Sequence, residues 1–270
     1  MGFTMIGELL NTSRPGIQKA VEQRDEETIC PLVLLQEKQG AAYIDINAGA
    51  GVHTERRDMQ WLVRTVQAVT NLPLCLDSPD PHVLASAWEI LDRPPMINSI
   101  SLEKNRFQSM LDLLKGRECQ VVALCMDDTG MPETAEQICG RAHALVNGLA
   151  GIHIQPNAIW IDPLVGPVST HTGNGLISLK AVALIKKQIP GINTVCGLSN
   201  ISFGLPNRRI INRMFLGLMM GQGLDGAIMD PGDRDLTAAL KTVQMLMNQD
   251  EYCMGFMEYF AANSLQADHQ

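Results

Sequence analysis

The chain has 270 residues, of which 46% are hydrophobic and 19% are charged, and its formal net charge is −8. This composition is typical of a soluble globular protein and excludes a disordered chain, and no apolar stretch is long enough to span a bilayer. The acidic balance argues against a nucleic-acid partner, because nucleic-acid-binding proteins concentrate Lys and Arg on one face.

Short apolar runs alternate with amphipathic stretches along most of the chain, a pattern that predicts a parallel sheet with crossover helices. Several runs are almost continuously apolar, as expected of strands that are covered on both faces. In chain order we predict a strand at 5–8, a strand at 43–48 with a helix at 54–70, a strand at 72–77 with a helix at 81–90, a strand at 96–100 with a helix at 103–114, a strand at 120–127 with a helix at 133–149, a strand at 158–165 with a helix at 176–188, a strand at 193–199 with a helix at 209–220, a strand at 225–230 with a helix at 233–247, and a short last helix at about 250–262.

The number of strands distinguishes between the two common parallel folds. Eight strands are typical of a closed barrel, whereas an open doubly wound sheet usually has fewer strands and a glycine-rich first turn that this chain lacks. A barrel of this kind takes about 250 residues and folds as one unit. The sequence therefore predicts an α/β protein, a single (β/α)8 TIM barrel that spans residues 1–270 as one domain.

Seven cysteines are scattered along the chain without a C-x-x-C pair. This is typical of reduced thiols, and their positions favour small buried hydrophobic residues over a zinc site. The N-terminus has no cationic segment ahead of an apolar one, so we expect no secretion signal. Together these features predict a cytoplasmic protein without a metal centre.

Each apolar run ends in a carboxylate or carboxamide, at the place where a barrel enzyme carries its binding and catalytic groups. Because all parallel strands end on the same face, these side chains should ring one mouth of the barrel. Any one of the acids could instead cap the helix that follows it. The eight residues are Glu8, Asn47, Asp77, Asn98, Asp127, Asp162, Asn200 and Asp230.

Three of these residues, Asp77, Asn98 and Asp162, come from separate strands and offer acceptor groups or mixed acceptor and donor groups. A carboxylate can accept hydrogen bonds from two adjacent donors at once, which orients a ligand as well as binding it. A flat heterocycle with an amino group beside a ring N–H presents such donors. The sequence therefore favours a pterin or a guanine-like ligand at the mouth.

Motifs around these positions resemble those of the methyltetrahydrofolate:corrinoid-protein methyltransferases, over nearly the whole chain. The folate-binding module of cobalamin-dependent methionine synthase is similar as well. The motifs are LCLDS, MINS, IWIDPL, GLSNISFGLPNR, the INRMF stretch after the seventh expected strand, and MNQDEYC near the end.

The resemblance implies a methyltransferase that moves a methyl group between N5 of tetrahydrofolate and the cobalt of a corrinoid. The sequence does not set the direction of transfer. A chain of this length that forms one barrel has no room for a corrinoid (cobalamin) domain, so we expect a partner protein to carry the corrinoid. Similar enzymes are homodimers, and we expect the interface at the methionine-rich last barrel helices.

The resemblance also implies roles for individual residues. Asp77, Asn98 and Asp162 would bind the pterin ring, and Asn200 would be the catalytic residue that approaches N5. An amide can donate a hydrogen bond to N5 in one state and accept one from protonated N5 in another. A preorganised group of this type typically contributes about 3 kcal/mol to a transition state.

Two cations are implied as further folate-binding residues. Lys186 and Arg208 match positions that contact the folate in similar enzymes, near its benzoyl-glutamate carboxylates.

Phe203 departs from the family pattern, in which some members have a polar residue at this place. His171, in the loop after the sixth expected strand, could gate the mouth or be solvated.

Two other functions are compatible with pterin-binding residues at a barrel mouth. A dihydropteroate synthase binds its pterin on a similar barrel, but its reaction expels pyrophosphate and needs anion-binding groups near the reacting carbon. A non-catalytic folate-binding protein would need Asp77, Asn98 and Asp162 but not Asn200. Replacement of Asn200 would therefore separate an enzyme from a binding protein.

Overall fold

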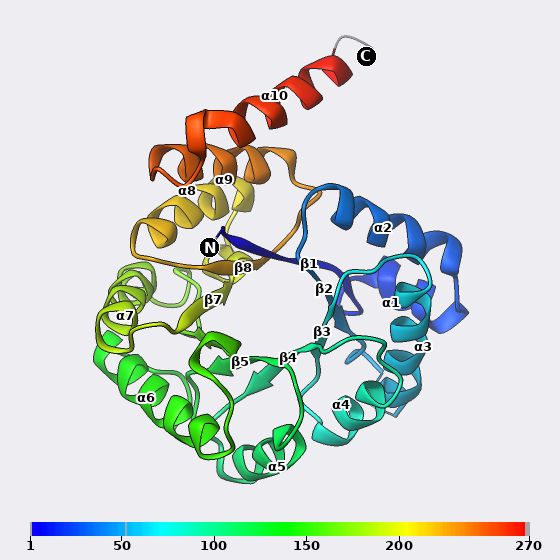
Figure 1. Ribbon diagram of the computed structural model, residues 1–270, viewed down its shortest axis with the longest axis vertical. Helices are drawn as coiled ribbons and strands as arrows, with labels where there is room; N and C mark the ends of the chain where they lie inside the picture. The colour runs from blue at the N-terminus through cyan, green and yellow to red at the C-terminus, as the bar shows by residue number, and fades with distance from the viewer. Residues whose placement is uncertain (1, 52, 268–270) are drawn as a thin grey trace.

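Eight parallel strands close into a barrel in the order in which they occur along the chain (Figure 1). The computed structural model describes residues 2–51 and 53–267. The strands are β1 (Thr4–Asn11), β2 (Tyr43–Asn47), β3 (Leu74–Asp77), β4 (Met96–Ile100), β5 (Gln120–Leu124), β6 (Ile159–Asp162), β7 (Asn193–Gly197) and β8 (Gly226–Met229). Strand β1 pairs with both β2 and β8, which closes the sheet and confirms the predicted (β/α)8 TIM barrel.

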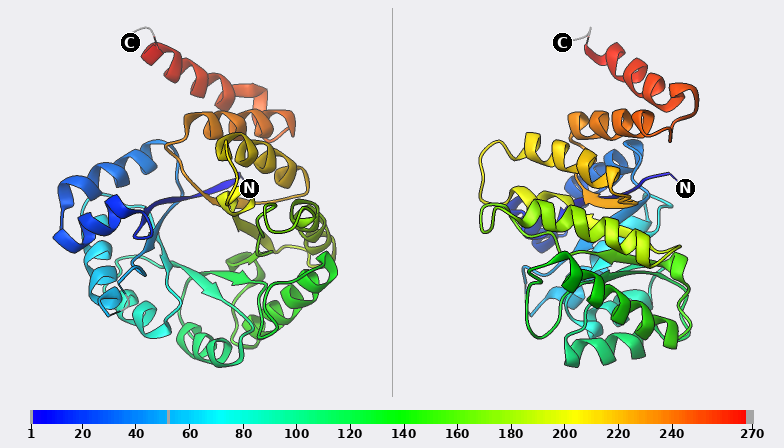
Figure 2. Two further views of the ribbon diagram at one scale, coloured as in Figure 1. Left: turned by 180° about the vertical axis from the view of Figure 1, so that it is seen from behind. Right: turned by 90° about the vertical axis from the view of Figure 1, so that its left-hand side faces the viewer.

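Helices surround the barrel and connect each strand to the next (Figure 2). The main apolar core lies between the strands and these helices. Every predicted helix is present, with bounds shifted by a few residues. The helices are α1 (Pro15–Gln23), α2 (Glu26–Lys38), α3 (Glu55–Gln67), α4 (Pro81–Trp88), α5 (Lys104–Leu114), α6 (Ala135–Gly151), α7 (Asn174–Gln188), α8 (Arg208–Gly221), α9 (Arg234–Leu246) and α10 (Met254–Ala267), with short 3-10 turns η1 (Pro156–Ala158), η2 (Leu198–Ser202) and η3 (Glu251–Cys253).

Helices α1 and α2 fill the segment between β1 and β2, where the sequence analysis predicted no helix. Pro31 lies inside α2, and a proline within a helical pattern normally marks a helix boundary. Start signals were nevertheless present. Pro15 occupies the first turn of α1, and the Asp25 carboxylate accepts a hydrogen bond from Thr28 N (3.1 Å) at the start of α2.

The barrel interior is filled by side chains that alternate along the strands. One layer of the interior is apolar and buried. The next inward side chain, two residues further along each strand, faces the carboxyl-terminal mouth, so the fold itself brings the strand-end residues together. The apolar layer contains Ile6, Cys75, Met96, Val122, Trp160 and Val195, and the positions two residues later are Glu8, Asp77, Asn98, Leu124, Asp162 and Gly197.

The last helix, α10, packs against α9 and extends away from the barrel (Figure 2). It spans Met254–Ala267, which is later than the predicted range of about 250–262. The reason is that the preceding residues form the separate turn η3, in which Tyr252 has a positive φ of 54° and interrupts the helix.

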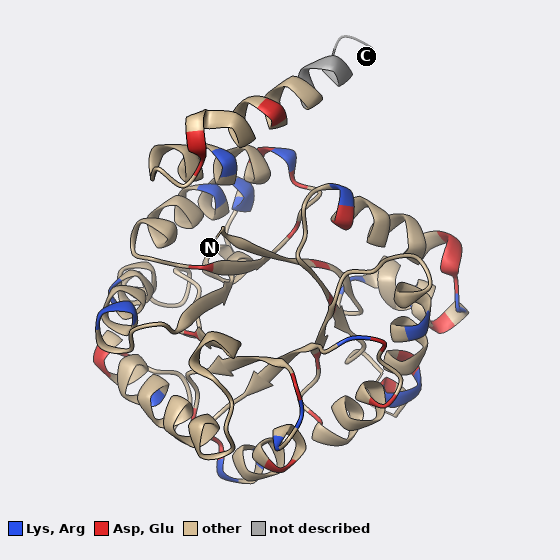
Figure 3. Ribbon diagram, in the orientation of Figure 1, with Lys and Arg blue, Asp and Glu red and all other residues tan. Residues whose placement is uncertain are grey.

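Charged residues of both signs are interspersed around the outer ring of helices (Figure 3). Such mixing is typical of a solvated surface, because it avoids large areas of one charge. Of the helices in the described part of the chain, none is both long enough and apolar enough to cross a membrane.

Gly226 in β8 lies where the barrel has little room for a side chain. A Cβ atom added there would be 2.7 Å from the Thr4 carbonyl oxygen and 3.1 Å from the Trp160 ring. Gly226→Ala is therefore expected to lower the free energy of unfolding by about 2 kcal/mol, because overpacking displaces neighbouring backbone. Urea denaturation measures this change.

The control for this substitution is Gly140→Ala in α6, where an added Cβ meets no atom within 4 Å. Alanine has a higher helix propensity than glycine, so this change is expected to raise the free energy of unfolding by up to about 1 kcal/mol. Effects of the same sign at the two positions would contradict the steric explanation.

Candidate active site

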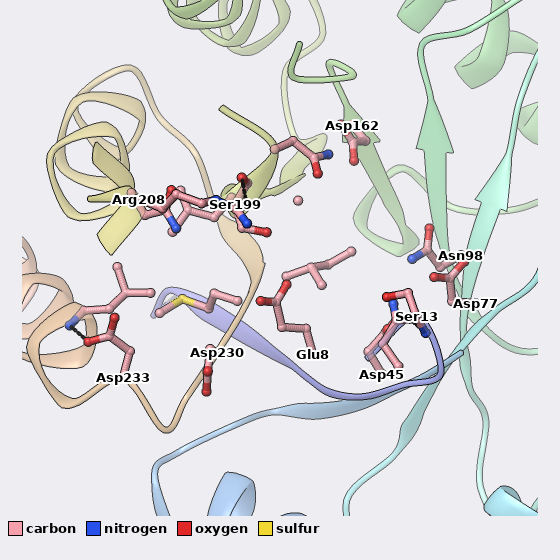
Figure 4. A pocket seen from close by; sticks show the side chains of 18 of the residues that line it. Glu8, Ser13, Asp45, Asp77, Asn98, Asp162, Ser199, Arg208, Asp230 and Asp233 are labelled. Carbon is pink, nitrogen blue, oxygen red and sulfur yellow. Dashed lines mark hydrogen bonds between the residues drawn. The ribbon is translucent and has the colours of Figure 1, made fainter. Parts of the chain in front are cut away.

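A cavity of about 850 Å³ opens at the carboxyl-terminal ends of the strands. This is the end of the barrel at which polar strand-end residues were predicted to gather (Figure 4). The structure brings most of them together around one space. Six of the eight predicted residues line the cavity, namely Glu8, Asp77, Asn98, Asp162, Asn200 and Asp230.

The other two strand-end residues have structural roles. Asn47 donates a hydrogen bond from Nδ2 to Asp77 Oδ2 (2.9 Å), so it orients that carboxylate. Asp127 lies beyond the end of β5, where it forms an ion pair with Arg141 (2.8 Å). The inward position at the end of β5 belongs to Leu124, which lines the cavity, so the predicted place of Asp127 at the mouth is wrong.

Asp77, Asn98 and Asp162 face the cavity from three strands (Figure 4). Burial raises the pKa of Asp77, and the hydrogen bond from Asn47 opposes this rise. Asp162 is 9% exposed and accepts a hydrogen bond from Leu164 N (2.7 Å). Burial raises the pKa of Asp162 to about 7 despite backbone N–H groups that lower it. These acceptors are poorly solvated, so a ligand that brings N–H donors would stabilise their charged forms.

Asp45 is a cavity residue that the sequence analysis missed. Its side chain is buried, and its Oδ1 atom has no hydrogen-bond partner within the described part of the chain. Burial and the neighbouring Asp77 carboxyl raise the pKa of Asp45 well above its usual range, which favours the protonated acid. The available signal was an acid inside an apolar strand, two residues before Asn47 and therefore on the same inward face.

Glu8 faces the cavity from the end of the apolar part of β1 (Figure 4). Burial raises the pKa of Glu8 to about 7, while the ion pair with Arg14 (3.2 Å) opposes the rise. Together with the three aspartates described above, Glu8 makes the cavity an acidic hollow. Groups with pKa values near neutrality can take up or release protons under physiological conditions, which is typical of catalytic sites.

Asn200 lies in η2, the turn that directly follows β7, and lines the cavity. The strand ends at Gly197, where a Cβ atom would approach the Asn200 Nδ2 atom to 3.0 Å. A glycine at this strand end therefore leaves room for the amide. The amide is placed on a turn rather than on a strand, and its side chain is exposed to the solvent of the cavity mouth.

Lys186 does not lie at the cavity. Its ammonium group donates to the Ile192 carbonyl oxygen (2.9 Å) and forms an ion pair with Asp225 (2.8 Å). These partners precede β7 and β8, so Lys186 lies near the amino-terminal ends of the strands, opposite the mouth. This placement does not fit the folate-binding role predicted for Lys186.

Arg208 lines the cavity at the start of α8, beside Ser199 (Figure 4). Its guanidinium group lies 5.9 Å from the centre of the Phe203 ring, and Phe203 is 64% exposed at the rim. Phe203 thus contacts Arg208 from the solvent side. His171 is exposed in the loop after β6 and is not a lining residue of the cavity, which agrees with the solvated alternative.

The cysteines are free thiols, and five of them are buried. Burial raises the pKa of Cys75, which lies in the apolar layer of the barrel, well above its ordinary value. Such thiols behave as small hydrophobic residues, as predicted. Among the described residues, no group of three or more His, Cys, Asp and Glu side chains could hold a metal ion.

Comparison with known sequences gives three similarities. Residues 7–230 match the family described as pterin binding enzyme. The chain is 35% identical over 258 residues to the methylcorrinoid:tetrahydrofolate methyltransferase of Eubacterium limosum, and the match covers 95% of each protein. It is 30% identical over 237 residues to the methionine synthase of Mycobacterium tuberculosis, covering 83% of this chain and 20% of that protein. The matched region is therefore about a fifth of that relative's length.

Comparison with solved structures gives dihydropteroate synthase from Xanthomonas albilineans. Its complex with 7,8-dihydropteroate has a TM-score of 0.70 at 19% identity, covering 91% of this chain and 93% of that one. Its structure with 4-aminobenzoic acid has a TM-score of 0.70 at 18% identity, covering 92% and 93%. At this level of identity the likeness shows a shared barrel fold.

Proposed function

Because this chain belongs to the pterin-binding enzyme family, we propose that it transfers a methyl group from a corrinoid carried on a partner protein to N5 of tetrahydrofolate. The observation that carries the proposal is the convergence of Asp77, Asn98, Asp162 and Asn200 on one cavity at the barrel mouth. The name of the Eubacterium limosum relative supports the substrates and this direction.

The aspartates and Asn98 suit the donor edge of a pterin. The 2-amino group and ring N–H of the pterin can donate to carboxylate oxygens, and Asn98 can both accept and donate. Asp162 is a buried acceptor and Asp77 is a partly buried one, and Asp45 Oδ1 is a buried acceptor without a partner in the described structure. A pterin would supply the missing donors, so the residues present fit this ligand.

The proposed reaction forms a bond between N5 and the methyl carbon as the cobalt–carbon bond breaks. The N5 lone pair attacks the methyl group, the electrons of the cobalt–carbon bond remain on cobalt, and N5 then loses its proton to water. The Asn200 amide would accept a hydrogen bond from N5 while it carries both the proton and the methyl group, and donate one to neutral N5. Asn200 thereby stabilises the charge that develops on N5.

The test of the proposed function is methyl exchange with free corrinoids. The purified protein should convert methylcobalamin and tetrahydrofolate to cob(I)alamin and methyltetrahydrofolate, or the reverse, with a change in the corrinoid absorption spectrum. Bound tetrahydrofolate with no spectral change in either direction would contradict an enzyme and favour a non-catalytic folate-binding protein. Formation of dihydropteroate from a dihydropterin pyrophosphate and 4-aminobenzoate would instead favour a dihydropteroate synthase.

A homodimer is the oligomeric state that the exposed apolar surface favours. Ile210, Met214 and Leu218 are 57%, 63% and 57% exposed and recur every four residues along α8. Residues at this spacing form one stripe on a helix. Two exposed methionines on α10, Met254 and Met257, add to the apolar surface of the last helices.

Met214→Glu is expected to convert the dimer to a monomer, because burying a carboxylate in an apolar interface is unfavourable. Sedimentation velocity measures the change. The same substitution at Leu34 on α2, which is 49% exposed, is the control and should leave the sedimentation coefficient unaltered. A wild-type protein that sediments as a monomer would contradict the homodimer.

The free thiols also support a cytoplasmic location. Cytoplasmic thiols are normally kept reduced, and the described cysteines form no disulfide. We therefore infer that the enzyme works in the cytoplasm, where a corrinoid-carrying partner protein would reach the barrel mouth.

A further inference from the structure

An arginine at the start of α8 holds the turn that carries Asn200. Arg208 Nη2 donates to the Ser199 carbonyl oxygen (2.8 Å), and Arg208 Nε donates to the Ser202 hydroxyl (3.1 Å). The Ser202 hydroxyl in turn donates to the Ser199 carbonyl oxygen (3.2 Å). These acceptors, a backbone carbonyl and a side-chain hydroxyl, belong to the residue immediately before Asn200 and the residue two positions after it, so the guanidinium group contacts the turn on both sides of the amide.

A second set of hydrogen bonds fixes the same turn from the loop after β6. Val168 N donates to the Ile201 carbonyl oxygen (3.0 Å), and the Ser169 hydroxyl donates to the Phe203 carbonyl oxygen (2.6 Å). The turn is therefore attached to the neighbouring loop as well as to α8. Arg208 is the charged member of this arrangement, and hydrogen bonds from a charged donor are stronger than neutral ones.

The geometry of the chain directs Arg208 toward the turn. Asn207 adopts a left-handed conformation with φ of 52°, and α8 begins at the next residue. The guanidinium group then lies between the turn and the exposed ring of Phe203. Two of its nitrogen atoms, Nε and Nη2, donate to acceptors of the turn, so the protein itself fixes the orientation of the guanidinium group.

We propose that Arg208 is a positioning residue, which holds the Asn200 amide at the place where N5 reacts, and that it is not a ligand for the glutamate carboxylates of the folate. This assignment rests on the proposed methyl transfer. It differs from the carboxylate-binding role that the sequence resemblance implied for Arg208. The structure assigns the residue to the backbone that carries the catalytic amide.

The test measures kcat and KM for methyl transfer with free cobalamin and two methyl substrates. One is methyltetrahydrofolate, and the other is a methylated tetrahydropterin without the benzoyl-glutamate tail. Arg208→Ala should lower kcat by about 10- to 100-fold with both substrates, because small displacements of a catalytic group can cost about that much. The dissociation constant of each substrate should change by less than about threefold, well below the roughly tenfold effect that a lost charged contact of about 1.4 kcal/mol would give.

A double-mutant cycle tests whether Arg208 acts through Asn200. Residues that work as one unit have non-additive effects, whereas independent residues have effects that multiply. In the Asn200→Ala background, Arg208→Ala should therefore lower kcat by less than about threefold. Arg209→Ala is the control, because Arg209 also lines the cavity but forms its ion pair with Asp233 (3.9 Å), outside the turn that carries Asn200. Its effect should multiply with that of Asn200→Ala.

Arg208→Lys provides a conservative comparison. Lysine keeps the charge but lacks the planar fork that reaches both Ser199 and Ser202, so the kcat of Arg208→Lys should stay below about a tenth of the wild-type value, within the roughly 10- to 100-fold loss expected for Arg208→Ala. Full restoration by lysine would overturn the positioning role in favour of simple charge. If Arg208→Ala fails to fold, Ser202→Ala removes one acceptor of the guanidinium and should show the same non-additivity with Asn200→Ala.

Several outcomes would overturn the assignment. A loss confined to the substrate with the glutamate tail, with a higher KM and unchanged kcat, would make Arg208 a carboxylate ligand. Effects of Arg208→Ala and Asn200→Ala that multiply would show that Arg208 does not act through the amide. An inactive wild-type protein would overturn the proposed function and this role with it, whereas an active wild type with either result above would overturn this role alone.

Discussion

Asn200→Ala is expected to lower the rate of methyl transfer by about 100- to 1,000-fold, the range seen when one hydrogen-bonding group that stabilises transition-state charge is removed. The amide lies in η2 at the mouth of the cavity, whereas the proposed pterin acceptors lie on the strands. The dissociation constant of tetrahydrofolate should therefore change by less than about threefold, because the groups that hold the ring remain in place. Single-turnover kinetics and equilibrium titration measure the two quantities separately.

The control for this prediction is Asn105→Ala. Asn105 is exposed at the start of α5 and lies outside the cavity that Asn200 lines. The control should keep the rate within about twofold of the wild type, as is usual for surface substitutions away from functional groups. A loss of folate affinity as large as the loss of rate would make Asn200 a binding residue, and an unchanged rate would remove it from the reaction.

The strands and the outline of the mouth could be predicted because buried parallel strands have a simple sequence signature. Apolar runs ended by polar residues located all eight strands, and the period of two along a strand placed Asp77, Asn98 and Asp162 at one level of the barrel. The same rule misplaced Asp127, because β5 ends at Leu124 and not three residues later. The face on which a side chain lies depends on the exact strand end.

Other residues could not be placed because their position depends on partners that are distant in the sequence. Asp45 reads as part of an apolar strand, and only the neighbouring strands show that its carboxyl faces the cavity. Lys186 lies twelve residues after the start of α7. Because an α-helix rises about 1.5 Å per residue, Lys186 is about 18 Å along the helix from the mouth. A helix that returns from the mouth to the next strand start takes its last residues to the opposite end of the barrel.

The hydrogen bonds of Arg208 illustrate the same limit. The sequence motif predicted that Arg208 contacts the folate near its glutamate carboxylates, and Arg208 does line the cavity. The sequence could not show whether the guanidinium group donates to a substrate carboxylate or to oxygen atoms of the protein, because both kinds of oxygen accept hydrogen bonds from arginine. Only the positions of Ser199 and Ser202 in the folded turn separate these possibilities.

Asp162→Asn is expected to make the ligand-free protein more stable at pH 8 than the wild type, while it weakens folate binding. Burial raises the pKa of Asp162 from 3.8 to about 7. The folded state therefore holds the proton more tightly than the unfolded state, and the wild type loses stability as the pH rises from about 4 to about 7. Asparagine does not ionise, and its carbonyl oxygen can still accept the hydrogen bond from Leu164 N.

The difference in the free energy of unfolding between variant and wild type should thus grow with pH. Urea denaturation at pH 5 and pH 8 is expected to give a difference larger by about 2.7 kcal/mol at the higher pH, since the wild type loses about 1.36 kcal/mol for each of the roughly two pH units between pH 5 and the folded pKa of about 7. Asp127→Asn is the control. Hydrogen bonds from Thr129 lower the pKa of Asp127, so Asp127 is ionised at both pH values and its difference should not change between them.

The loss of binding in Asp162→Asn follows from the same carboxyl. A carboxylate accepts two N–H donors of a pterin edge, whereas an amide presents one acceptor and one donor toward them. The variant should bind tetrahydrofolate at least about tenfold more weakly, because a buried donor is left without an acceptor. The Asp162 carboxyl destabilises the ligand-free barrel when it ionises, and the N–H donors of the bound pterin would stabilise that ionised form. An equal stability difference at pH 5 and pH 8 would contradict the raised pKa, and unaltered folate affinity would place the pterin away from Asp162.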